Sequence, residues 1–241
     1  MIRRLAVVIG VIAASVLVAA QRKPSDPQTA GHMREHYTQV HAVEHAVIRG
    51  DLEAVKEPAT WLAAHEASQE LDKASAAQVS AMRQAARRAA DAEDLKSAAT
   101  ATAAMLAACG DCHRAAAVVP PVPVPDRPAV AGSVGHMLEH QRAVDQMANG
   151  LIVPSTGMWK EGADALKASP LRAGDLPRDP KLTREIAAAE DRVHVLADQA
   201  SAAAEESARV NAYAQIISTC AQCHGLHGRI WGPGLPKAEV K

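Results

Sequence analysis

Two short motifs contain all the cysteines of this 241-residue chain. The motif CGDCH occupies residues 109–113 and CAQCH occupies residues 220–224, so each pair of thiols is followed at once by a histidine. Three chemistries use a CxxC pair: a structural zinc site, a thioredoxin-type redox disulfide, and the covalent attachment of a haem.

The spacing of the two motifs favours haem. Zinc sites built from two CxxC pairs usually separate the pairs by about 15–20 residues, whereas residues 113–219 lie between Cys112 and Cys220. A thioredoxin-type disulfide belongs in a βαβ unit, and no stretch of this chain alternates like a strand. In a haem site, the two thiols add to the vinyl groups of a porphyrin and the adjoining histidine binds the iron. We therefore expect two covalently attached haem c groups, held by Cys109, Cys112 and His113 and by Cys220, Cys223 and His224.

The composition agrees with a flat apolar cofactor that fills the interior, or with a plain Ala/Leu/Val bundle. The chain has three Trp, two Tyr and no Phe, although large rings normally supply much of the buried area of a core. Alanine dominates instead, and it makes strong helices with shallow packing surfaces. The charge is nearly balanced, with 26 basic and 27 acidic residues, so nucleic acid is not an expected partner.

The chain contains an internal duplication. GHMREH at residues 31–36 returns as GHMLEH at 135–140, an offset of 104, and residues 31–66 align with 135–170 with 12 identities in 36 positions. The two CxxCH motifs are offset by 111, so the second copy carries seven extra residues, which we place in the loop-like segment 169–180. A period this long indicates duplicated domains.

Each copy has the periodicity of four helices. We expect helices over 32–49, 51–65, 69–91 and 94–115, and again over 136–151, 158–168, 181–204 and 207–225. The predicted fold is therefore all-α, with two tandem four-helix bundles that each bind one haem. The first haem bundle covers residues 30–117, the second covers 131–228, and a C-terminal tail covers 229–241. The five prolines of 118–128 predict an extended, semi-rigid linker over 118–130.

The start of the chain resembles an export signal. MIRR is basic, residues 5–20 form a 16-residue apolar run, and small residues close it at Ala20. Residues 1–20 are predicted to be a signal peptide or, uncleaved, an N-terminal membrane anchor. Both possibilities predict a periplasmic protein, soluble or anchored to the inner membrane.

A CxxCH near the end of the fourth helix of a bundle resembles the class II c-type cytochromes, the family of cytochrome c-prime, here as a tandem dihaem fusion. The resemblance implies that the motif histidines, His113 and His224, are the proximal ligands. It also implies that the first helix lines the opposite face of the haem and carries either a methionine ligand or no ligand.

The repeated HMxEH signature supplies candidates for a sixth iron ligand. We prefer His36 and His140, which lie in the apolar stripe one turn inside the helix, with Met33 and Met137 as the runner-up. Two further possibilities are ligation by His32 and His136 at the helix entrance, and an open or water-bound iron. Imidazole or thioether ligation suits electron transfer, whereas an open position permits gas binding or peroxide chemistry.

The remaining histidines are not expected to bind a metal ion. His41 and His45 form an HxxxH, but their counterparts are Asp145 and Asn149, so we expect a polar helix face rather than a metal site. Three histidines without a matched partner are expected at the surface: His65, His194 and His227.

The predicted function is that of an exported dihaem cytochrome that carries single electrons between periplasmic or membrane redox partners, including a membrane respiratory complex. No nucleophile–base constellation or phosphate loop indicates an enzyme. Two different functions would need one vacant iron coordination position: a haem-based ligand-binding or sensor protein, and a catalytic dihaem peroxidase.

Overall fold

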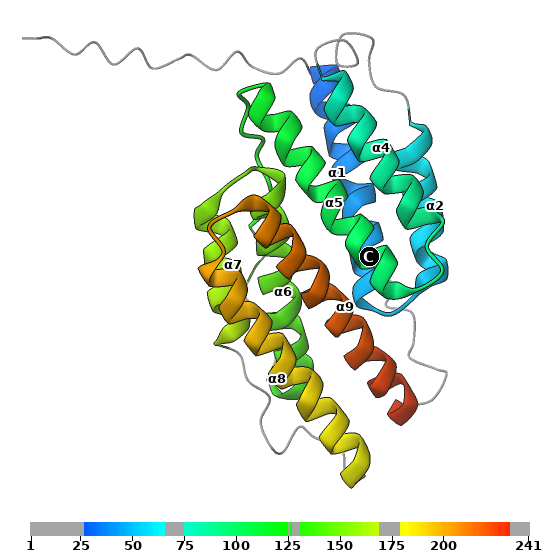
Figure 1. Cartoon of the computed structure of the whole chain (residues 1–241), viewed down its shortest axis with the longest axis vertical. Coiled ribbons are helices and arrows are strands. Elements are labelled where there is room, and N and C mark those ends of the chain that lie inside the picture. Colours follow the sequence, from blue (N-terminus) through cyan, green and yellow to red (C-terminus); the bar gives the residue numbers. More distant parts are fainter. Residues whose placement is uncertain (1–26, 66–74, 125, 127–130, 169–178, 232–241) are drawn as a thin grey trace, which may run out of the picture.

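The computed structural model describes residues 27–65, 75–124, 126, 131–168 and 179–231, with the backbone alone over 227–231. All regular structure in these residues is helical, which confirms the all-α prediction (Figure 1). The first half contains α1 (Pro27–Ile48), α2 (Leu52–Ala64), α4 (Ala76–Ala90) and α5 (Leu95–Ala115). The second half contains α6 (Gly132–Ile152), α7 (Thr156–Lys167), α8 (Pro180–Ala202) and α9 (Glu206–Trp231).

Several helix ends are set by local sequence. Asp51, Asp94 and Ser155 cap α2, α5 and α7, each accepting a hydrogen bond from the backbone amide three residues on, at 3.0, 2.7 and 3.3 Å. Such caps satisfy N–H groups that have no partner within the helix. Gly50 follows the end of α1 with a φ of +75°, a conformation that glycine adopts without steric cost.

The helix positions reproduce the duplication. The caps Asp51 and Ser155 are 104 residues apart, and the first residues of α5 and α9, Leu95 and Glu206, are 111 residues apart. The extra residues of the second copy therefore lie after the start of α7 and before α9. The predicted segment 169–180 falls in this interval, but residues 169–178 lie outside the described part of the chain.

The helices of each half contact one another in a closed ring. In the first half the contacts run α1–α2, α2–α4, α4–α5 and α5–α1, and in the second half α6–α7, α7–α8, α8–α9 and α9–α6. The two rings also contact each other. The central pair is α5 and α9, which lie side by side in Figure 1, and α5 also contacts α6 while α1 contacts α9.

The proline-rich segment between the halves is non-helical over 118–124, as its prolines predict. It is not a free tether, because the Asn149 side-chain amide donates a hydrogen bond to the Pro123 carbonyl at 3.0 Å. Val122 is half-buried and packs against the core. This segment therefore lies against the second half.

Some expected boundaries differ or fall outside the described residues. The third helix, expected from residue 69, is described as α4 from Ala76, and residues 66–74 are not among those described. The last helix, expected over 207–225, continues to Trp231 and so passes the expected end of the second bundle at 228. The predicted signal or anchor at 1–20 also lies outside the described residues, and none of the helices within them is both long and apolar enough to cross a membrane.

Candidate functional site

The two CxxCH motifs lie in equivalent helices, one in the last turns of α5 and the other in α9. All four cysteines are free thiols. Cys220 and Cys223 are buried, and Cys109 and Cys112 are half-buried. In each helix the two cysteines are therefore about one turn apart, and the histidine follows the second cysteine directly.

Each motif histidine is oriented by a main-chain carbonyl. Nδ1 of His113 lies 2.7 Å from the Ile152 oxygen, and Nδ1 of His224 lies 2.6 Å from the Ile48 oxygen. A carbonyl oxygen only accepts, so Nδ1 is the donor and Nε2 carries the lone pair in the neutral ring. Histidines that bind metals are usually held in this way, with one nitrogen donating to the protein and the other on the metal.

The carbonyl comes from the other half of the chain in both motifs. Ile48 and Ile152 are the last residues of α1 and α6 and occupy equivalent positions of the repeat. His113 and His224 are equivalent in the same way. Two related units that exchange the same contact form an isologous interface. Each motif is therefore completed by the opposite half.

Close backbone packing accompanies this exchange. A Cβ on Gly110, the second residue of CGDCH, would lie 2.3 Å from the carbonyl oxygen of Leu151 at the end of α6. At the equivalent position, Ala221 is buried, and its carbonyl oxygen would lie 3.3 Å from a Cβ on Gly50. Each CxxCH thus rests on the C-terminus of the first helix of the other half.

The second motif borders a small cleft, and most of the residues predicted to bind the second haem line it. The cleft brings the motif together with both candidates for the distal ligand, His140 and Met137, and with Ile48 of the other half. Val144 and Val193 give it apolar walls. Its lining residues include Ile48, Met137, His140, Val144, Glu190, Val193, Cys220, Cys223 and His224.

Glu190 of α8 is the buried carboxylate of this region. Its Oε1 lies 3.2 Å from His136 Nε2, 3.3 Å from His194 Nε2 and 3.7 Å from His140 Nε2. Burial alone would raise the pKa of Glu190, but the imidazole of His136 at 3.2 Å and the charges of the three histidines hold it below its ordinary value. The prediction that His194 lies at the surface is wrong, because its ring is half-buried beside Glu190, one turn earlier on α8, and lies edge-on to the ring of His140.

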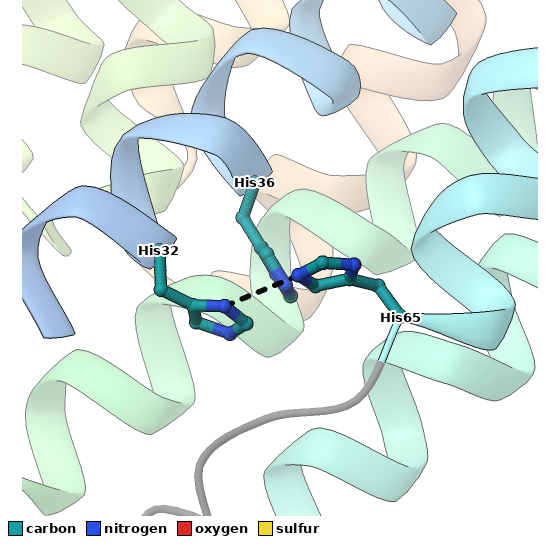
Figure 2. Close-up of side chains that lie close together, drawn as sticks. All are labelled: His32, His36 and His65. Atoms are coloured by element: carbon teal, nitrogen blue, oxygen red, sulfur yellow. Dashed lines mark hydrogen bonds between the residues drawn. The ribbon is translucent and has the colours of Figure 1, made fainter. Parts of the chain in front are cut away.

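The first half has a histidine cluster in place of that carboxylate. His32, His36 and His65 converge from α1 and the end of α2 (Figure 2), with His65 Nε2 3.3 Å from His32 Nδ1. Trp61 stacks on His65 with ring centroids 3.9 Å apart. The prediction of a surface position for His65 is also wrong, and this stacking explains why.

The imidazole of His36 is suited to bind a metal ion. Its Nε2 is buried and has no hydrogen-bond partner. Burial and the neighbouring His32, His65 and Arg83 lower the pKa of His36 to about 4. The ring is therefore neutral near pH 7, which is the form that binds metal ions. Met33, the runner-up in this half, is half-buried on the same helix.

The thiols do not resemble those of the zinc or redox-disulfide chemistries. Burial raises the pKa of Cys109 and Cys220 to about 12 and that of Cys223 to about 11. Redox-active CxxC thiols have a lowered pKa, often at a helix N-terminus, whereas Cys109 and Cys112 lie near the C-terminus of α5. Among the described residues, no cysteine belongs to a group of side chains close enough to share an ion, so the two pairs do not form one zinc site.

Comparison with known proteins adds no family. No protein-family model, curated protein or solved structure matches this chain. The resemblance to the class II c-type cytochromes therefore depends on the position of the two CxxCH motifs and on the helical layout.

Proposed function

We propose that this chain is an exported dihaem c-type cytochrome, built as two four-helix bundles, that carries single electrons between redox proteins. The observation that carries the proposal is the pair of motif histidines whose Nδ1 atoms donate to main-chain carbonyls at 2.7 and 2.6 Å. The same orientation at two equivalent CxxCH motifs is expected if both imidazoles present Nε2 to a metal.

The residues present fit two covalent haems. Cys109, Cys112 and His113 would hold one, and their equivalents Cys220, Cys223 and His224 would hold the other. A haem iron bound in this way supplies a one-electron Fe(III)/Fe(II) couple. The protein contributes the carbonyls that fix the two imidazoles and, in the second half, the apolar cleft walls of Val144 and Val193.

His36 and His140 remain our proposed sixth ligands, with Met33 and Met137 as the runner-up. His140 lines the cleft beside Cys220 and Cys223, and the carboxylate of Glu190 approaches its ring. Histidine ligands commonly have such a carboxylate partner. For His36 the support is the buried Nε2 without a hydrogen-bond partner.

The proposed partners are periplasmic or membrane redox proteins, including a respiratory complex. The apolar N-terminal segment would export the protein and, where uncleaved, anchor it to the inner membrane. The motif helices α5 and α9 lie against each other. This arrangement suits the passage of an electron from one half to the other.

Carbon monoxide tests the proposed sixth ligand. The reduced wild-type protein is expected to bind carbon monoxide slowly or not at all, because both irons are six-coordinate. His140→Ala vacates one position and is expected to bind one equivalent rapidly, as followed by the visible absorption spectrum after mixing.

Met137→Leu is the matched control, since Met137 lines the same cleft. It is expected to behave like the wild type. Rapid binding by Met137→Leu and not by His140→Ala would assign the ligand to Met137. Rapid stoichiometric binding by the wild type would contradict six-coordinate electron transfer and support a ligand-binding haem protein.

A further inference from the structure

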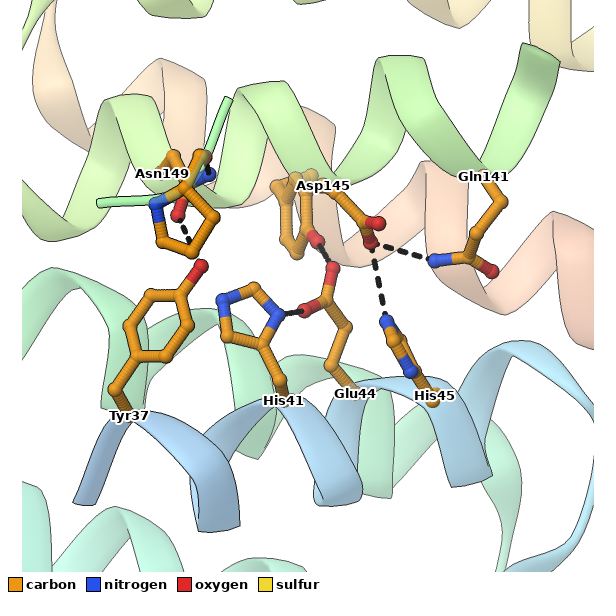
Figure 3. Close-up of polar contacts among 9 residues, drawn as sticks. Tyr37, His41, Glu44, His45, Gln141, Asp145 and Asn149 are labelled. Carbon is orange, nitrogen blue, oxygen red and sulfur yellow. Dashed lines mark hydrogen bonds and ion pairs between the residues drawn. The ribbon is translucent and has the colours of Figure 1, made fainter. Parts of the chain in front are cut away.

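A polar cluster separate from both CxxCH motifs lies between the first helices of the two halves. His41, Glu44 and His45 lie within one turn of α1, and Asp145 faces them from α6 (Figure 3). The HxxxH of α1, expected to be a polar helix face, faces the other half of the chain. Sequence patterns do not indicate this cluster, because Asp145 joins it only through tertiary packing.

The geometry is that of a compact set of metal ligands. His41 Nδ1 lies 2.6 Å from Glu44 Oε2, and His45 Nε2 lies 3.1 Å from Asp145 Oδ1. One ligand atom from each of the four residues lies within 4.8 Å of the other three. Two histidines four residues apart on one helix have the spacing with which helices bind zinc.

Burial and charge favour a cation here. The Glu44 side chain is fully buried, and those of His41 and Asp145 are only 12% and 20% exposed. Two carboxylates held together away from water repel each other and are costly unless a positive charge compensates them. A dication bound to both, with two neutral imidazoles, leaves no net charge.

Further side chains fix the two carboxyl groups. The buried Tyr213 hydroxyl donates to Glu44 Oε1, the oxygen that does not face His41. The Gln141 amide donates to Asp145 Oδ1 at 2.6 Å. Hydrogen bonds of this kind orient the carboxylate ligands of metal sites.

We propose that His41, Glu44, His45 and Asp145 form a binding site for one divalent transition-metal ion, zinc foremost, that links the two halves of the chain. Zinc takes histidine nitrogen and carboxylate oxygen as ligands and is usually four-coordinate, so a set of four such donors suits it. The repeat provides one such site per chain, because the positions equivalent to Glu44 and His45 are Ala148 and Asn149. The ion would hold α1 against α6, and the ends of these helices orient both motif histidines.

Zinc titration of the full-length protein tests the proposal. After treatment with a chelator, the wild type is compared by calorimetry with His45→Ala and Asp145→Asn at matched haem content. These two ligands are the more exposed ones, so their replacement leaves no large cavity. Each variant is expected to lose one bound zinc per chain or to bind it at least about tenfold more weakly.

Two other histidine clusters, around His36 and Glu190, could also take zinc, but they are the same in every variant. Tyr37→Phe is the matched control, because Tyr37 bonds Asn149 in the same interface and supplies no ligand. It is expected to bind zinc like the wild type. Equal stoichiometry and affinity in the wild type and both ligand variants would overturn the proposal and leave a hydrogen-bonded polar network only.

Wild-type crystals grown with zinc keep the proposal testable if the variants fail to fold. An anomalous scattering peak among the four side chains is the expected result. Ordered side chains without a peak at this position would overturn it. Because neither readout depends on haem, a negative result here leaves the proposed cytochrome function standing.

Discussion

Replacing Cys220 and Cys223 by alanine is expected to halve the haem content of the protein, from two haems per chain to one. The double variant removes both thioether bonds of the second motif and leaves Cys109, Cys112 and His113 unchanged. The measurement is the pyridine haemochrome absorbance per polypeptide after expression in a host that matures c-type cytochromes.

The reciprocal variant, Cys109→Ala with Cys112→Ala, is the control for this experiment. It is expected to keep the other haem, so the two variants should each contain one. Two remaining haems in either variant would show that the cysteines do not attach the cofactor. Loss of both haems in each variant would contradict two separately formed sites.

The second large effect is expected at Gly110. Gly110→Ala places a Cβ 2.3 Å from the Leu151 carbonyl oxygen, a main-chain atom that can move only if α6 moves. Overpacking of this kind typically costs about 1–3 kcal/mol. Because His113 bonds the next carbonyl, that of Ile152, the change should also disturb the orientation of its imidazole.

Gly225→Ala is the matched control for Gly110→Ala. Both glycines are in helices that carry a motif, so both gain about 1 kcal/mol of helix propensity from alanine, but a Cβ on Gly225 would meet nothing within 4 Å. Urea unfolding should show Gly110→Ala less stable and Gly225→Ala equal to or more stable than the wild type. Equal stability of the two variants would contradict the close contact between the halves.

Most of the fold could be predicted because local rules determine it. Helical periodicity predicts 94–115, and α5 spans Leu95–Ala115 with Asp94 as its cap. The repeat offsets of 104 and 111 locate the extra residues between the second and fourth helices of the second copy. These features depend on residues near in sequence, where pattern and propensity are informative.

The hydrogen bonds between each motif histidine and the other half could not be predicted in the same way. The acceptors for His113 and His224 are main-chain carbonyls of Ile152 and Ile48, and every residue has a carbonyl. Only the packing of the two halves decides which carbonyl meets the imidazole. The expectation of two bodies on a proline-rich linker contains no such interface.

The histidines outside the motifs illustrate the same limit. His65 and His194 have no equivalent in the other copy, and the lack of a match predicts surface positions. Their surroundings also depend on tertiary neighbours, His32 of α1 for His65 and His140 of α6 for His194. Alignment of the two copies identifies residues that both halves share, and it gives no information on a histidine that only one half contains.

The contact between the two halves bears on how electrons would pass between the two proposed haems. On the sequence alone, electron exchange between the two sites depends on whether the linker lets the bundles approach. In the structure α5 contacts α9, and Arg114 beside the first motif pairs with Glu206 at the start of α9 at 2.5 Å. The first motif therefore lies beside the start of α9, 14 residues or roughly 21 Å of helix from Cys220. We expect electrons to pass between two haems at opposite ends of the α5–α9 pair.

The intact mass of the unfolded wild-type protein, purified from a host with c-type cytochrome maturation, tests the central claim most directly. The expected mass is that of the polypeptide plus two haems that persist under denaturing conditions, because thioether bonds are covalent. A mass equal to the bare polypeptide would contradict the proposed cofactor and, with it, the proposed electron-transfer function.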